Sequence, residues 1–119
     1  MTQPAQPAAF AGGPLAGIRV LDLSTMLAGP YGATLLGDLG ADVVKVESHY
    51  GDESRHLGTE KRGERSPFLA LNRNKRSLAL DVTSEAGRPV FERLIEQADV
   101  FISNMRESAL AKHGADPET

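Results

Sequence analysis

The stretch of this sequence best suited to hold a small charged ligand is STMLAGPYG, at residues 24–32. An apolar run precedes it and a helical pattern follows, so we expect it to join the carboxyl end of a strand to a helix. Backbone N–H groups at a helix N-terminus favour an anion such as phosphate. The dinucleotide and ATP-binding fingerprints, G-x-G-x-x-G and G-x-x-x-x-G-K-[ST], are absent. The alternative is a tight turn whose glycines only let strand and helix pack.

A second candidate is the basic segment at residues 49–77. Seven basic and four acidic residues give it a net charge of +3, whereas the whole chain carries −3. Its most basic run, NRNKRS at residues 72–77, enters a predicted strand. This placement suits a phosphate-bearing ligand, and a solvated loop is the alternative.

The remaining polar residues give weaker signals. The three histidines (His49, His56 and His113) are not spaced as a helix-borne metal pair, and the chain has no Cys, so we expect no metal site, disulfide or cysteine nucleophile. Asp22 and Asp81 end apolar runs, where each could bind a ligand or cap the following turn.

The elements that must position these residues follow from hydrophobic periodicity. We predict strands at residues 18–23, 42–47, 77–82 and 99–103, helices at 30–39 and 88–97, and a last short helix around Leu110. Gly40 is expected to end the first helix, and residues 48–76 to form a long connection without regular structure.

This order predicts an α/β fold with a parallel sheet wrapped by crossover helices. Two helices and a short terminal helix are too little to cover four strands on both faces, so we interpret the chain as half of a doubly wound domain. We assign residues 1–14 to a flexible tail and residues 15–119 to this part-domain.

Composition also limits the partners and location of the chain. The acidic balance disfavours nucleic acid as a partner. The first thirteen residues lack the charge and apolar run of a secretory signal or membrane span, so we expect no membrane partner and a cytoplasmic location.

Four linked motifs resemble family III CoA-transferases, the carnitine-dehydratase and bile-acid-inducible type. They are LAGIRVLDLS at residues 15–24 with AGP at 28–30, LGADVVKVE at 39–47 with GD at 51–52, NRNKRS at 72–77 with LD at 80–81, and NMR at 104–106. The resemblance covers residues 15–114, and it is specific because the motifs occur in register.

The resemblance implies a Rossmann-like domain that binds coenzyme A as an acyl-CoA substrate. Transferases of the family move CoA between carboxylic acids through an aspartyl-CoA thioester, whereas the racemase relative moves the α-proton of an acyl-CoA. In both branches the catalytic residues lie beyond position 119, so no catalytic residue is assigned to this chain, which we expect to be inactive alone. Full-length members form interlocked homodimers. The alternatives are an acyl-CoA racemase, a stand-alone CoA- or nucleotide-binding module, and a truncation product without activity.

The family's CoA-contacting segments map onto three strand ends and one position beyond them. These residues are Leu27, Ala28, Leu80, Asp81, Val82, Thr83, Asn104, Met105, Arg106 and Lys112. Three positions depart from the pattern. Ser48 stands where the family has a phosphate-binding Arg, which weakens the case for phosphate binding unless Arg55 or another loop base substitutes. Glu107-Ser108 replaces the family's Pro-Gly. Pro89 predicts a helix that is kinked or begins near Arg88.

Overall fold

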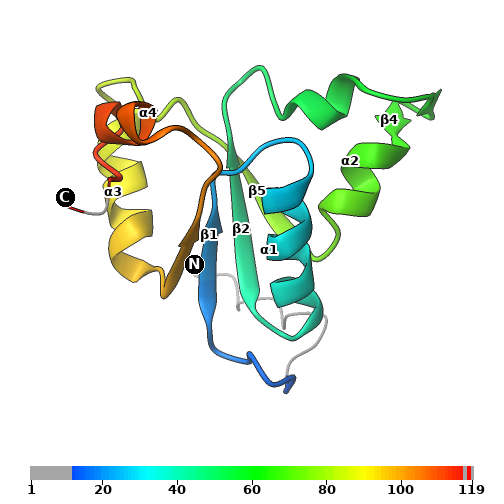
Figure 1. Ribbon diagram of the computed structural model, residues 1–119, viewed down its shortest axis with the longest axis horizontal. Helices are drawn as coiled ribbons and strands as arrows, with labels where there is room; N and C mark the ends of the chain where they lie inside the picture. The colour runs from blue at the N-terminus through cyan, green and yellow to red at the C-terminus, as the bar shows by residue number, and fades with distance from the viewer. Residues whose placement is uncertain (1–11, 117, 119) are drawn as a thin grey trace, which may run out of the picture.

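The computed structural model describes residues 12–116 and 118 and has an α/β fold (Figure 1). The strands are β1 (Arg19–Asp22), β2 (Asp42–Glu47), β3 (Glu60–Lys61), β4 (Glu64–Arg65), β5 (Lys75–Ala79) and β6 (Val100–Ile102). The helices are α1 (Ala28–Asp38), α2 (Ser66–Leu71), α3 (Gly87–Gln97), α4 (Glu107–Lys112) and the 3-10 turn η1 (Glu53–His56).

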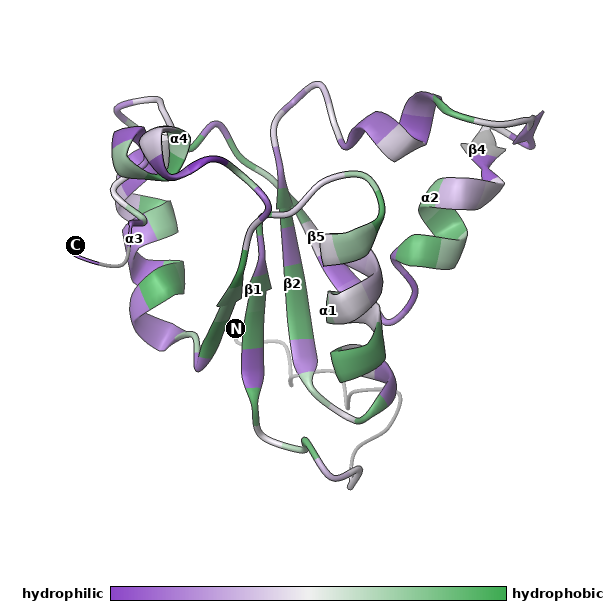
Figure 2. Ribbon diagram, in the orientation of Figure 1, coloured by the Kyte–Doolittle hydropathy of each residue, from purple (hydrophilic) through white to green (hydrophobic). Residues whose placement is uncertain are grey.

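Four strands form one parallel sheet in the order β5-β2-β1-β6. The predicted parallel sheet is therefore confirmed. Each of the two inner strands, β1 and β2, carries two of the buried apolar side chains, and Figure 2 shows apolar residues along both. All carboxyl ends of the parallel strands lie at one edge of the sheet, which is the upper edge in Figure 1.

The two long helices cover opposite faces of the sheet. Val20 packs with Ala33 and Leu36 of α1, whereas the next residue, Leu21, belongs to the cluster that includes Phe91 of α3. Successive strand residues point to opposite faces, so these contacts place α1 and α3 on different sides, as in a doubly wound domain.

The helix boundaries agree with the turn chemistry of the sequence. Gly40 has φ +103° just after α1, the conformation expected of a glycine that ends a helix. Pro89 lies in the first turn of α3, which begins at Gly87, so the prediction of a helix starting near Arg88 is confirmed. Within the described residues no helix has the length and apolarity needed to cross a membrane.

Two sequence predictions are wrong in detail. Residues 48–76 contain η1, the antiparallel hairpin β3–β4 and α2, rather than a connection without regular structure. The guanidinium carbon of Arg55 lies 3.6 Å from the ring centroid of Phe68, which joins η1 to α2. The third strand lies at Lys75–Ala79 instead of 77–82, because the charged residues that begin it are neutralised by partners: Lys75 by Asp22 and Arg76 by Asp42.

Candidate functional site

A cavity of about 210 Å³ lies at the carboxyl ends of β1, β2 and β5, where doubly wound sheets bind ligands. Apolar side chains and carboxylates share its wall. The lining residues are Leu23, Thr25, Val46, Glu47, Ser48, Gly51, Asp52, Leu80, Asp81, Val82, Thr83, Met105 and His113. Among the residues that the structure describes, no Lys or Arg lines it, so the cavity itself disfavours an anionic group and suits a partly apolar one.

The predicted CoA-contacting residues divide into two sets. One set lines the cavity: Leu80, Asp81, Val82, Thr83 and Met105. The other set lies outside the lining: Leu27, Ala28, Asn104, Arg106 and Lys112. Arg106 and Lys112 are exposed at the two ends of α4, and each is next in sequence to a lining residue. The fold therefore puts apolar side chains within the cavity and two exposed basic residues next in sequence to its lining.

Asp81 gives the cavity an exposed carboxylate. Hydrogen bonds from the Thr83 hydroxyl (2.6 Å) and the Thr83 backbone N–H (3.0 Å) hold the pKa of Asp81 below its ordinary value. The side chain is therefore an anionic acceptor at neutral pH, suited to bind a ligand hydroxyl or amino group.

The turn between β1 and α1 is joined to the loop after β6. The side-chain amide of Asn104 accepts a hydrogen bond from Thr25 N (3.1 Å) and donates one to Thr25 O (2.8 Å). Asn104 thus joins the loop after β6 to the turn after β1. Leu27 is 64% exposed at the start of α1, whose N-terminus has no side-chain cap.

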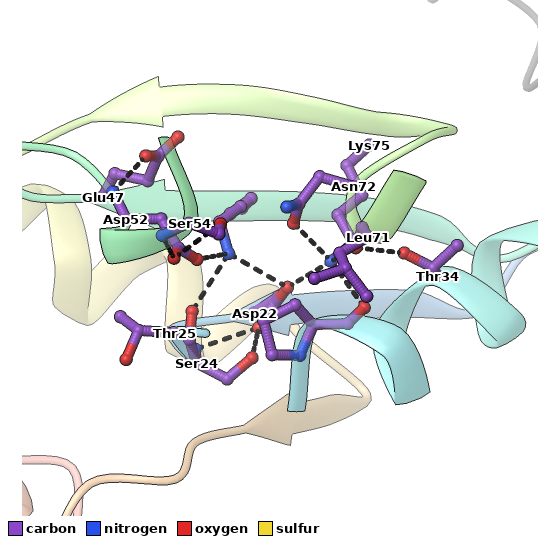
Figure 3. Close-up of polar contacts among 12 residues, drawn as sticks. Asp22, Ser24, Thr25, Thr34, Glu47, Asp52, Ser54, Leu71, Asn72 and Lys75 are labelled. Atoms are coloured by element: carbon purple, nitrogen blue, oxygen red, sulfur yellow. Dashed lines mark hydrogen bonds and ion pairs between the residues drawn. The ribbon is translucent and has the colours of Figure 1, made fainter. Parts of the chain in front are cut away.

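Beneath this turn lies a buried group of two carboxylates and two lysines (Figure 3). Lys45 Nζ is 2.7 Å from Asp52 Oδ2 and 3.9 Å from Asp22 Oδ2, and Lys75 Nζ is 2.8 Å from Asp22 Oδ2. All four side chains are at most 2% exposed. Such charges are tolerated in a protein interior only when they are paired and hydrogen-bonded.

Lys75 connects this group to two helical segments. Its ammonium also donates to Pro30 O (2.8 Å), Asn72 Oδ1 (2.8 Å) and Leu71 O (3.2 Å), so it ties α1 to the segment between α2 and β5. Burial lowers the pKa of Lys75, and Asp22 opposes that change.

The loop after β2 is held by carboxylates. Glu47 accepts from Arg55 Nε (2.7 Å), Arg55 Nη2 (2.8 Å) and Asp52 N (2.7 Å). Burial alone would raise the pKa of Glu47, but these hydrogen bonds outweigh it and lower the pKa. Arg55, the base suggested as a replacement for the missing Arg at Ser48, is therefore engaged with Glu47.

Sequence reasoning missed Lys45, Glu47 and Asp52 as parts of this region. One signal was available: a strand buried on both faces normally reads as an apolar run, and Lys45 interrupts one. A lysine there requires a buried carboxylate, but the partner's position in the loop after β2 is not visible in the sequence. Among the described residues, no three His, Asp or Glu side chains gather where they could hold a metal ion.

The chain is similar to known proteins along most of its length. Residues 15–119 match the family described as CoA-transferase family III. The chain is 48% identical over 103 residues to the succinyl-CoA–L-malate CoA-transferase beta subunit of Chloroflexus aurantiacus, covering 85% of this chain and 25% of that protein. It is 41% identical over 114 residues to the succinate–glutarate CoA-transferase of Agrobacterium fabrum, covering 89% and 28%.

The fold agrees with these sequence matches. The crystal structure of a CAIB/BAIF family protein from Brucella suis superposes with a TM-score of 0.83 at 43% identity, covering 89% of this chain and 29% of that one. The chain thus spans 25–29% of the length of these three relatives.

Proposed function

Because the chain belongs to CoA-transferase family III, we propose that it is the CoA-binding N-terminal part of an acyl-CoA transferase. The complete protein would move CoA between carboxylic acids through an aspartyl-CoA thioester. The transferase names of the relatives support this activity over racemisation. Since the chain spans about a quarter of those relatives, the activity is proposed for the complete protein.

The observation that carries the proposal is the cavity at the strand ends. Residues 80–83 and Met105, which the sequence resemblance nominates as CoA contacts, line one cavity although they follow different strands. Its apolar wall suits the adenine ring of CoA. Asp81 would accept a hydrogen bond from the adenine amino group or a ribose hydroxyl.

The phosphates of CoA would lie outside the cavity, because the described part of its wall carries carboxylates and no Lys or Arg. We assign them to the exposed Arg106 and Lys112 and to the uncapped amides at the start of α1, beside Leu27 and Ala28. The interlocked homodimer that the resemblance implies stays a prediction for the complete protein.

The test is a titration of CoA against the wild type, Arg106→Ala and a control, Lys61→Ala, at low and high salt. Lys61 lies on the exposed hairpin β3–β4, away from the cavity. A well-formed charge-assisted hydrogen bond is worth about 1.5–3 kcal/mol, and an exposed one less, so we expect Arg106→Ala to weaken binding by about threefold to tenfold at low salt. The control should bind as the wild type does. Equal affinity and salt dependence for Arg106→Ala would remove this residue from the site.

We further propose that this chain alone has no turnover, because the family's catalytic Asp would lie beyond Thr119. Thioester exchange between an acyl-CoA and a free carboxylate should stay at the uncatalysed rate. Exchange above that background that a substitution in this chain abolishes would refute the proposal.

A further inference from the structure

The turn that leads into α1 contains a backbone conformation that its own sequence does not favour. Met26 has φ +70°, in the left-handed region that residues other than glycine seldom adopt. Such a residue persists only where its surroundings hold it. Its N–H donates to Asp52 Oδ1 (3.1 Å), so the loop after β2 holds the turn after β1.

Asp52 is buried, and hydrogen bonds fix its carboxylate in place. It is 1% exposed, and the same Oδ1 accepts from Ser54 N (2.9 Å) and Ser54 Oγ (2.8 Å). Its other oxygen is paired with Lys45 at 2.7 Å, and Lys45 in turn donates to Ser24 O (3.0 Å). One ion pair therefore fixes the turn at both Ser24 and Met26.

Because Asp52 is charged, its role can be tested by whether its removal strengthens or weakens CoA binding. Burial would raise the pKa of Asp52, but hydrogen bonds from Lys45, Ser54 and Met26 lower it, so the carboxylate is ionised at neutral pH. Asp52 also lines the cavity. A carboxylate that acted on CoA by charge alone would repel its phosphates, and removing it would strengthen binding.

We propose that Asp52 is a positioning residue for CoA, which holds the turn at Ser24 and Met26 in its binding shape without touching the ligand. The identity of the ligand rests on the proposed function. The mechanism itself concerns the turn: without the acceptor at Asp52, Met26 leaves its left-handed conformation and the first amides of α1 lose their orientation.

The test compares Asp52→Ala, Asp52→Asn and the control Ser54→Ala in the intact protein. Each variant is titrated with CoA at low and high salt, and amide hydrogen exchange is measured at Met26. Asparagine keeps an oxygen that can accept from Met26 N, and Ser54→Ala removes one hydrogen bond to the same carboxylate without touching the turn.

We expect Asp52→Ala to weaken CoA binding by about fivefold to tenfold, as for one lost hydrogen bond, with the same ratio at both salt concentrations. Exchange at Met26 should accelerate in this variant. Ser54→Ala should stay within about twofold of the wild type in affinity and in exchange at Met26, because it removes neither contact of the turn. Asp52→Asn keeps an acceptor for Met26 N but loses the ion pair with Lys45. Exchange at Met26 should therefore stay near that of the wild type, and CoA affinity should lie between those of the wild type and Asp52→Ala. Adding Met26→Gly to Asp52→Ala should restore part of the affinity, because glycine adopts a positive φ without strain.

Tighter binding of Asp52→Ala at low salt, or unchanged affinity in the folded variant, would overturn the proposal. If Asp52→Ala does not fold, Asp52→Asn decides: a gain in affinity at low salt, or loss of protection at Met26, would contradict it. A wild type that does not bind CoA would refute the proposed function instead, and exchange at Met26 would still show whether Asp52 holds the turn.

Discussion

Two turns at the ligand edge of the sheet begin with nearly the same three residues. Asp22-Leu23-Ser24 begins at the last residue of β1, and Asp81-Val82-Thr83 lies just after β5. In each, the Asp carboxylate accepts a hydrogen bond from the backbone N–H two residues later, at 2.9 Å and 3.0 Å. Asp22 is fully buried and meets two lysines, whereas Asp81 is exposed and lines the cavity.

The difference comes from strand order. β1 lies between β2 and β6, so the end of β1 is surrounded by the loops of its neighbours. β5 is an edge strand, and the Asp81 turn is held by its own residues Thr83 and Ser84. The same local motif is thus part of the structural core in one turn and available to a ligand in the other.

The largest effect should come from breaking the buried group beside Asp22. Lys75→Met leaves the more distant Lys45 as the remaining lysine partner of Asp22 and removes three further hydrogen bonds. Removing one partner of a buried ion pair typically costs about 3–5 kcal/mol, so we expect that loss in the free energy of unfolding, measured by urea denaturation. Lys61→Met on the exposed hairpin should change it by less than about 0.5 kcal/mol. A loss of similar size in both variants would mean that burial of the charge is unimportant.

Acid should have the second largest effect, through the carboxylates that hold the turn after β1 and the loop after β2. The loss in free energy of unfolding should be smaller than for Lys75→Met, because a protonated carboxyl keeps some of its hydrogen bonds. The pKa values of Asp52 and Glu47 are lowered from 3.8 and 4.5 in the folded protein. Their contribution is therefore complete above those ordinary values and is lost as the pH falls through the folded pKa values. We expect the free energy of unfolding to fall with pH below about 4.5. Asp52→Asn should flatten this dependence, and an unchanged slope in that variant would show that other groups cause it.

The smallest effect should come from the exposed turn. Asp81→Ala removes two local hydrogen bonds that water can replace, so we expect a loss of about 0.5–1.5 kcal/mol in the free energy of unfolding. The same substitution at Asp22 should cost several times more, because it leaves Lys75 buried without its carboxylate. Comparable losses in the free energy of unfolding for Asp81→Ala and Asp22→Ala would contradict the view that only the Asp22 turn belongs to the structural core.

The sequence was sufficient for the features that depend on local patterns. The apolar runs predicted β1, β2 and β6 and the helical stripes predicted α1 and α3, each to within about two residues. The strand-end position of the cavity also followed, because parallel strands bring their carboxyl ends to one edge.

Features that depend on distant partners were not predicted. The basic run at residues 72–77 suited a phosphate-bearing ligand or a solvated loop, yet Lys75 is buried and pairs at 2.8 Å with Asp22, 53 positions earlier in the chain. Asp52 was part of a motif that resembles the family, but its contact with Met26, 26 positions earlier, was not predicted. A single sequence shows which residues need partners but not which residues supply them.

The pairing of β1 with β6 has a consequence for the order of folding. Arg19 N donates to Asp99, 80 residues later, and Leu23 N donates to Ile102 O. Contacts between distant residues carry a larger loop-closure entropy and form more slowly than local ones. During synthesis, β1 can pair with β2 early, but its other edge stays open until Val100–Ile102 have left the ribosome. We therefore expect β6 to join the sheet last, with an exposed β1 edge throughout translation of the preceding helices.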